Sequence, residues 1–208
     1  MAAQRRPRRA DGEVSRRRIL DAATEIASER GYEGTSIAAV SAKSGLPASS
    51  IYWHFTDKDD LLAAVIERSF TDWLSSWQMP DAGPAPERLV ALATHTAKAL
   101  SDSPDFLRLG LMLALERRPV EPRAREVFVR IRGRAIETVA AAMSDIVSGL
   151  SDDQARQLAA YAIAGADGIF IAKEIGGDSV DMLEMFAMHG RALYDTAERM
   201  AATSALLN

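Results

Sequence analysis

Residues 35–58 read TSIAAVSAKSGLPASSIYWHFTDK, and this stretch decides the fold of the N-terminal quarter of the chain. The pattern predicts two short helices, 36–44 and 47–54, joined by a tight turn at Gly45. Pro47 suits the first turn of the second helix because its missing N–H needs no partner there. Two short helices joined by a glycine-containing turn, behind a longer helix, predict a helix-turn-helix motif.

The helical pattern continues on both sides of this motif. Before it, apolar residues recur at spacings of three and four, and Gly31 ends the helix; these residues are Ile19, Leu20, Ala23, Ile26 and Ala27. After it, proline and glycine breaks separate six further predicted helices: one from 57 to either 73 or 77, then 86–100, 104–116, 122–148, 151–175 and 180–202. No strand-like alternation competes, so we expect an all-α fold of about nine helices.

The distribution of charge suggests a basic head on an acidic body. The net charge of the 208 residues is −4, but residues 1–58 carry 10 Lys and Arg against 7 Asp and Glu. Residues 59–208 carry 15 against 22. A basic end can bind nucleic acid while the acidic remainder discourages unspecific binding. We therefore predict a disordered basic arm at 1–13 and a DNA-binding helix-turn-helix domain at 14–58, followed by an acidic body at 59–208.

Composition excludes several other classes of protein. The chain has no cysteine, which rules out disulfides, thiolate chemistry and cysteine-based zinc sites. No apolar run approaches the roughly 20 residues of a membrane helix, and the arginine-rich start lacks the apolar core of a secretory signal. We expect a cytoplasmic protein that does not contact a membrane.

The residues around the predicted motif resemble the N-terminal signature of TetR-family transcriptional regulators. The matching segments, about residues 15–65, are RILDAA from Arg18, GYEGTSI from Gly31, Gly45-Leu46, IYWHF from Ile51, Lys58 and Leu61-Leu62. Ser41 and Ser44 depart from the alanines common in the family, and Pro47-Ala48 replaces a more usual Ser-polar pair. The resemblance implies a DNA-reading head, a helical ligand-binding and dimerisation domain at 59–208, and a homodimer.

The second helix of the motif supplies the side chains expected to meet DNA. The hydroxyls of Ser49 and Ser50 suit base edges, and the N-terminus of the motif's first helix, at Thr35 and Ser36, suits a phosphate. The resemblance implies further contacts from Tyr52 and Lys58. Phe55 is expected in the core instead. The predicted DNA contacts are Thr35, Ser36, Ala48, Ser49, Ser50, Tyr52, Trp53, His54 and Lys58. For each of them packing, capping or a solvated surface position is the alternative, and the arginine arm is either a further contact or an inert tail.

The body is expected to bind a small apolar or amphipathic ligand. Aromatic and methionine side chains suit an adaptable apolar pocket, although core packing is the alternative for each. The candidates are Phe70, Trp73, Trp77, Phe106, Leu109, Met112, Leu113, Phe128, Ile163, Asp167 and Phe170. Asp167 stands out as a charge among apolar residues. It either selects a polar or cationic ligand group, pairs with an arginine or caps a broken helix.

The last two predicted helices carry apolar stripes that suit a dimer interface. A dimer doubles the bases read and recognises a near-palindrome. The predicted interface residues are Leu158, Tyr161, Gly165, Ile169, Phe186, His189, Leu193 and Met200. Packing within one chain is the alternative for the same stripes, and both can hold at once.

The sequence favours a regulator over an enzyme. The three histidines, His54, His95 and His189, are scattered, and no phosphate loop, metal-spaced cluster or nucleophile motif is present. We expect no catalytic residue, metal or cofactor. The expected function is a repressor that a ligand releases from its operator. The alternatives are a DNA-binding regulator without a small ligand, either an activator or one controlled by a protein, and, remotely, a helical enzyme.

Overall fold

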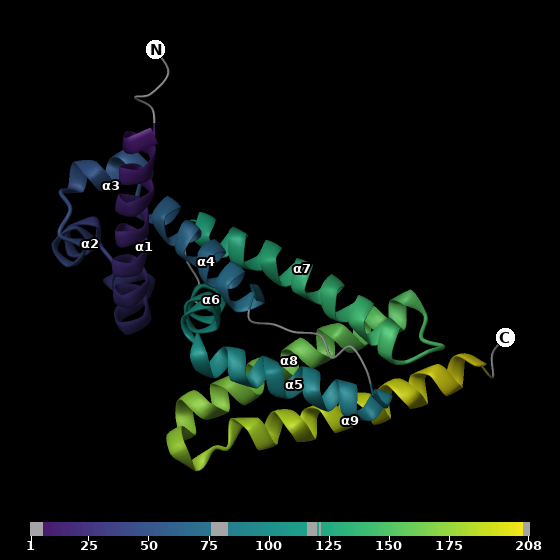
Figure 1. Cartoon of the computed structure of the whole chain (residues 1–208). Helices are drawn as coiled ribbons and strands as arrows, with labels where there is room; N and C mark the ends of the chain where they lie inside the picture. The colour runs from purple at the N-terminus through teal and green to yellow at the C-terminus, as the bar shows by residue number, and fades with distance from the viewer. Residues whose placement is uncertain (1–5, 76–82, 116–119, 121, 206–208) are drawn as a thin grey trace. The chain divides into compact units, whose positions relative to one another are not determined.

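The computed structural model describes residues 6–75, 83–115, 120 and 122–205 (Figure 1). Within these ranges every regular element is helical, which confirms the predicted all-α fold. The α-helices are α1 (Arg6–Gly34), α2 (Ile37–Ser44), α3 (Ala48–His54), α4 (Lys58–Ser75), α5 (Ala85–Asp102), α6 (Asp105–Leu115), α7 (Arg123–Ile146), α8 (Asp152–Gly176) and α9 (Met182–Ala205). A single 3₁₀ turn, η1 (Gly177–Ser179), joins the last two. None of the described helices is long and apolar enough to cross a membrane.

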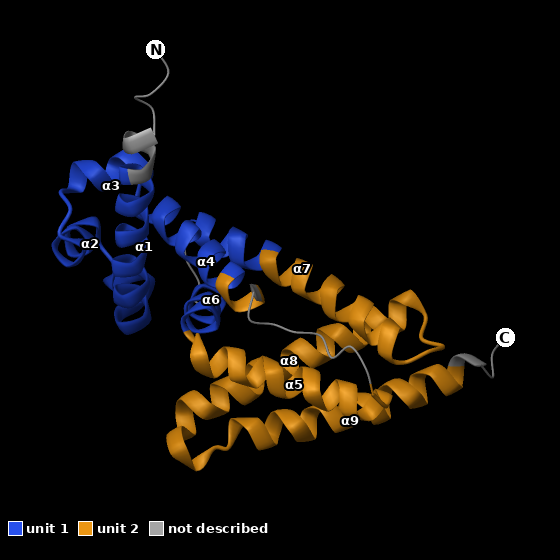
Figure 2. Cartoon of the chain, viewed as in Figure 1, with its two compact units in different colours: residues 1–71, 105–130 blue, residues 72–104, 131–208 orange. Residues whose placement is uncertain are grey.

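The chain folds into two compact units (Figure 2). The N-terminal unit comprises residues 1–71 and 105–130, and the C-terminal unit comprises residues 72–104 and 131–208. Helix α6 and the start of α7 therefore join the helix-turn-helix head, whereas the sequence grouped residues 59–208 together. The predicted functional division at residue 58 is a separate matter and stays a prediction.

The first helix begins earlier than expected. α1 starts at Arg6, whereas the sequence placed a disordered arm at 1–13 and the helix start at Val14. Arginine and alanine are good helix formers, and Pro7 falls in the first turn, where its missing N–H breaks no helical bond. Gly31 interrupts the helix as predicted, with φ 66° and ψ −170°.

The N-terminal unit has a core that the sequence pattern locates well. All five apolar residues of the predicted stripe from Ile19 to Ala27 are buried, and Leu61, Leu62, Val65 and Ile66 bury the inward face of α4. Helix α6 packs on α1, and Gly110 of α6 lies directly under the ring of Phe128. These contacts explain why α6 and the start of α7 join this unit.

The C-terminal unit is built on close packing of α5, α8 and α9. A Cβ added to Gly190 of α9 would lie 2.9 Å from the carbonyl oxygen of Leu89 in α5, so only glycine allows this approach. The buried cluster contains Leu89, Leu92, Met143, Leu158 and Leu193. A capping box at Ser151 and Gln154 starts α8, in agreement with the helix predicted over 151–175.

Candidate nucleic-acid interface

The turn between α2 and α3 is fixed by the residues that depart from the family pattern. Gly45 adopts the left-handed conformation (φ 66°, ψ 21°) and donates its N–H to the carbonyl of Ser41. The hydroxyl of Ser41 donates to the carbonyl of Leu46 at 2.7 Å. The guanidinium of Arg18 in α1 donates to the carbonyl of Ser44 at 2.7 Å. The hydroxyl of Ser44 accepts the N–H of Leu46 at 3.4 Å, so both serine side chains take part in the turn. The contact of Arg18 with the Ser44 carbonyl holds the end of α2 against α1.

Helix α3 is anchored on one side and exposed on the other. Ile51 and Phe55 are buried, and the guanidinium of Arg16 lies 5.4 Å from the centre of the Phe55 ring. Tyr52 is 57% exposed and Trp53 is 75% exposed. Burying a large aromatic side chain is favourable, so two adjacent exposed aromatic rings on one helix indicate a surface that binds a partner. The outer face of α3 is therefore a rigid surface suited to a partner.

The remaining predicted contacts on α3 lie on or beside this face. Ser49 is exposed, while Ala48, Ser50 and His54 are half-buried. The rings of Trp53 and His54 meet edge to face, with centroids 4.5 Å apart. The pKa of His54 lies below its ordinary value because burial disfavours the charged ring and Arg16 repels it, while Glu13 acts in the opposite direction. Burial and Arg16 thus both favour the neutral form of the His54 imidazole.

Two predicted phosphate contacts at the start of α2 differ in accessibility. Ser36 is exposed and caps α2, with its hydroxyl accepting the N–H of Ala39 at 3.1 Å. Thr35 is only 1% exposed, and its hydroxyl donates to the carbonyl of Gly31 at 2.8 Å. The hydroxyl of Thr35 therefore stabilises the end of α1 and is not presented at the surface.

Lys58 is engaged inside the protein. Its ammonium donates to the backbone carbonyl of Tyr32 at 3.2 Å and lies 4.2 Å from the centre of the Tyr32 ring. Glu33 is 3.6 Å away from it. The amine thus holds the start of α4 against the end of α1, and it would have to exchange these partners for a phosphate.

A hollow of about 350 Å³ lies between the start of α1 and the outer face of α3. Sequence analysis missed its α1 side, because helical periodicity does not reveal which residues of two crossing helices meet. The lining residues are Asp11, Gly12, Ser15, Ser49, Ser50, Trp53 and His54. Its α3 side consists entirely of residues predicted to contact DNA.

Most of the predicted ligand-binding residues are packed within their own unit. In the N-terminal unit the ring of Phe106 lies 5.3 Å from that of Phe70 and 5.7 Å from that of Phe128, and Leu109 and Leu113 are buried. Met112 is partly exposed and covers Gly31.

In the C-terminal unit, Phe170 is buried, whereas Trp73 and Ile163 are half-buried. Asp167 pairs with Arg132 of α7 through two hydrogen bonds of 2.9 and 2.5 Å, so the arginine-pairing alternative for Asp167 holds. Trp77 lies outside the described residues.

The predicted dimer residues separate into a buried and an exposed set. Leu158, Ile169, Phe186 and Leu193 are buried within the chain, as the alternative interpretation of these stripes expected. Met200 packs at the edge of the same core.

Tyr161 is exposed, and its ring centroid lies 6.2 Å from that of His189. His189 also bonds the carbonyl of Ala162 at 3.0 Å and covers Gly165. Sequence analysis missed four exposed apolar residues on the same two helices: Ile171, Ile175, Leu183 and Met188.

Comparison with known proteins identifies the class to which this architecture belongs. A helical head with an exposed recognition helix defines a helix-turn-helix protein. Residues 19–65 match the family model of bacterial regulatory proteins of the tetR family. The predicted resemblance of the N-terminal segment to this family is thus confirmed over residues 19–65.

Relatives and solved structures agree with this assignment. An HTH-type transcriptional repressor of Mycobacterium tuberculosis is 30% identical over 110 residues, 53% of this chain and 42% of that protein. The chain thus spans less than half the length of this curated relative.

Two solved structures share the fold. A tetR-family regulator from Streptomyces coelicolor has a TM-score of 0.72 at 18% identity, covering 93% of this chain and 87% of that one. A regulator from Saccharomonospora viridis, solved in complex with choline, has a TM-score of 0.67 at 23% identity, covering 89% and 96%.

Proposed function

We propose that the protein is a dimeric DNA-binding regulator that represses transcription from a near-palindromic operator and releases it when a small ligand binds. The observation that carries the proposal is the division of α3 into a buried side, with Ile51 and Phe55, and an exposed side, with Tyr52 and Trp53. A helix held rigidly with polar and aromatic side chains outward suits the width of the DNA major groove.

A selection from random duplexes with the purified protein tests the DNA-binding function. We expect enrichment of a near-palindrome and an affinity that falls steeply with salt, because phosphate contacts release counterions. Tyr52→Ala should abolish the enrichment without lowering the thermal midpoint, since Tyr52 is 57% exposed on the outer face of α3. Leu115→Ala is the matched control, since Leu115 is 74% exposed in the same unit. Weak binding without sequence preference would overturn the proposal.

The dimer rests on an apolar surface of the C-terminal unit. Tyr161, Ile171 and Ile175 are exposed along α8, and Leu183 and Met188 are exposed on α9. The exposed positions 160, 161, 164, 168 and 171 of α8 carry no charge. Exposed apolar residues gathered on two neighbouring helices are typical of protein interfaces, and a second copy of the chain offers the same self-complementary surface.

Sedimentation equilibrium tests the dimer directly. We expect the mass of two chains for the wild type and of one chain for Ile171→Lys, because a buried lysine would lack a counter-charge. Val129→Lys places the same charge on an exposed position of the N-terminal unit and should leave the dimer intact. A wild-type monomer at micromolar concentration would contradict this part of the proposal.

The ligand we propose is a small apolar or amphipathic molecule. A regulator with the same fold was solved in complex with choline, which supports the proposal that this protein also binds a small ligand. Because Asp167 is neutralised by Arg132, we place less weight on a cationic ligand than on a neutral or weakly polar one. The eleven residues predicted to bind it remain a prediction.

Binding of the selected operator, measured with and without candidate ligands, tests release. A ligand that prefers the DNA-free state must lower the operator affinity by its ratio of affinities for the two states. Choline and a long-chain fatty acid are suitable first probes, because they differ in charge and apolar length. A regulator without a small ligand is the second candidate, and operator binding that no member of a broad chemical panel changes would favour it.

We also propose that residues 14–58 read DNA, that residues 59–208 bind the ligand and dimerise, and that the protein is not an enzyme. The curated relative described above is named a transcriptional repressor, which supports this assignment. Such a regulator acts where the bacterial chromosome lies, so we place it in the cytoplasm.

A further inference from the structure

The hollow between α1 and α3 has a chemistry that the helix-turn-helix motif alone does not explain. Three serines line it, Ser15 from α1 and Ser49 and Ser50 from α3. None of these hydroxyls has a hydrogen bond to another described residue. Hydroxyls elsewhere in the unit, such as those of Thr24 and Ser28, donate to carbonyls of their own helix.

The other lining groups add donors and a flat apolar surface. The imidazole of His54 and the exposed indole of Trp53 form one wall. Arg16 acts on His54 electrostatically and adds positive charge nearby. A group that accepts several hydrogen bonds and carries a negative charge satisfies this set best. Next to a recognition helix, that group is a phosphodiester of the DNA backbone, to which about half to two-thirds of protein–DNA hydrogen bonds are made.

We propose that this hollow binds one phosphate at the edge of the major groove, with Ser15 contributing the contact from α1 and Trp53 packing on the adjoining deoxyribose. The inference rests on the proposed DNA-binding function and adds a site on α1 to it. It extends the DNA-contacting surface from α2 and α3 to the first helix. The contact fixes the position of α3 on the duplex without reading sequence.

Asp11 gives this proposal a distinctive signature. It is the one carboxylate among the lining residues, and its charge opposes a phosphate in the same hollow. A phosphate site predicts that removing this charge strengthens DNA binding. A site for a base amino group predicts the reverse, because a carboxylate accepts a hydrogen bond from cytosine N4. The sign of the Asp11→Asn effect therefore distinguishes the two occupants.

The first experiment measures the affinity of the full-length protein for the selected operator and for an unrelated duplex of equal length. Ser15→Ala should weaken both by about five-fold, the typical worth of one hydrogen bond. Ser28→Ala is the matched control on the same helix, since its hydroxyl donates to Thr24 within α1. Asp11→Asn should strengthen binding to both duplexes several-fold.

The second experiment locates the phosphate. Single phosphates of the operator are replaced in turn by neutral methylphosphonates, and each duplex is measured with the wild type and Ser15→Ala. At one position per half-site, the loss of affinity caused by the methylphosphonate and the loss caused by Ser15→Ala should be non-additive, as expected for groups in contact. Additive losses at every position would overturn the site, as would equal affinities of Ser15→Ala and Ser28→Ala.

The outcomes separate this inference from the proposed function. If the wild type selects an operator but Ser15→Ala leaves both affinities unchanged, only the α1 site fails. If Asp11→Asn weakens the operator alone, the hollow reads a base and the phosphate proposal is wrong. If the wild type binds no duplex at any salt concentration, the proposed function fails and this inference fails with it.

Discussion

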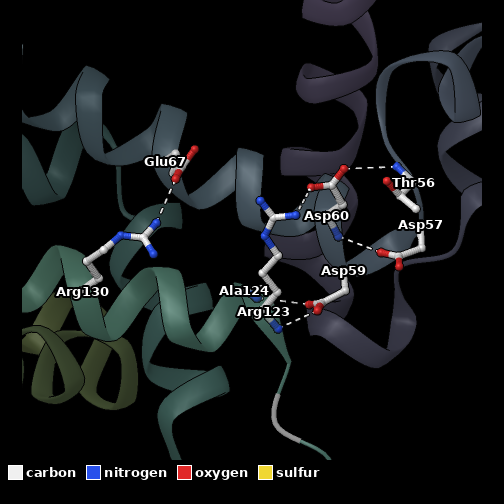
Figure 3. Close-up of polar contacts among 8 residues, drawn as sticks. All are labelled: Thr56, Asp57, Asp59, Asp60, Glu67, Arg123, Ala124 and Arg130. Carbon is white, nitrogen blue, oxygen red and sulfur yellow. Dashed lines mark hydrogen bonds and ion pairs between the residues drawn. The ribbon is translucent and has the colours of Figure 1, made fainter.

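The carboxylate of Asp59, in the first turn of α4, accepts the backbone N–H of Arg123, at the start of α7, at 2.5 Å (Figure 3). Its other oxygen accepts the N–H of Ala124 at 3.1 Å. A side chain 64 residues away in sequence thus caps α7, where two backbone donors lack partners in their own helix. Arg123 also pairs with Asp60 at 2.8 Å, so neighbouring acids of α4 hold both the backbone and the side chain.

Asp59→Asn should lower the free energy of unfolding by about 1 kcal/mol, the usual worth of a helix cap. Asparagine keeps one acceptor oxygen and loses the negative charge that favours a helix N-terminus. Urea unfolding at neutral pH measures the change. Glu67→Gln is the control, because its pair with Arg130 joins the same two helices but is solvent-exposed and worth about 0.5 kcal/mol or less (Figure 3). Equal effects of the two variants would contradict the capping role.

Replacing each of two helical glycines by alanine should change the stability of the protein in opposite directions. A Cβ at Gly110 would overlap the ring of Phe128, so Gly110→Ala should destabilise the protein by about 1–3 kcal/mol. A Cβ at Gly133 of α7 meets nothing within 4 Å. Gly133→Ala should therefore stabilise the protein by about 0.5–1 kcal/mol through helix propensity alone. Thermal unfolding of both variants gives the comparison, and a neutral Gly110→Ala would show that the aromatic ring yields freely.

Lys58→Met should cost about 1 kcal/mol of stability, because it removes the contact with the Tyr32 ring and the hydrogen bond to its carbonyl. We expect the salt dependence of DNA binding to stay unchanged, since the amine is already engaged. If Lys58 instead turned to a phosphate, the slope of log affinity against log salt would shrink by about 1. Measuring the affinity of both proteins from low to moderate salt separates the two roles.

The sequence located the helices well because local signals mark their ends. Gly45 and Gly31 needed positive φ, Ser151 supplied a capping box, and prolines marked several starts. The buried position of Phe55 was predicted as well, and Ile51, four residues earlier at helical spacing, is buried with it. These features depend on residues a few positions apart, which a single sequence displays directly.

Long-range polar contacts could not be predicted in the same way. Thr35 and Lys58 matched the pattern of surface contacts, yet each satisfies a backbone carbonyl near the end of α1. The capping of α7 by Asp59 and the pairing of Arg132 with Asp167 join residues far apart in sequence. The periodicity of a single helix does not indicate which acidic side chain will contact which hydrogen-bond donor of another helix. These partners can be assigned only from the folded structure.

His54 should make folding and DNA binding respond to pH in opposite directions. Its folded-state pKa is lowered below the ordinary value of 6.5, mainly by burial and then by Arg16, while Glu13 opposes this effect. Between pH 6.5 and that lower pKa the unfolded chain binds more protons than the folded one. The stability that the folded protein has with a neutral His54 is therefore lost as the pH falls through this window.

The effect on DNA binding has the reverse sign. A phosphate in the hollow favours the charged imidazole, so DNA binding takes up a proton and strengthens as the pH falls through the same window. Asp11 lines the same hollow. Glu13 favours the charged ring in the free protein, which reduces the effect without reversing it. His54→Gln should flatten both dependences while His95 and His189 remain. Urea unfolding and operator affinity, measured from pH 7.5 to pH 5.5 at constant ionic strength, check the two signs, and an operator affinity that does not change with pH would count against a phosphate beside His54.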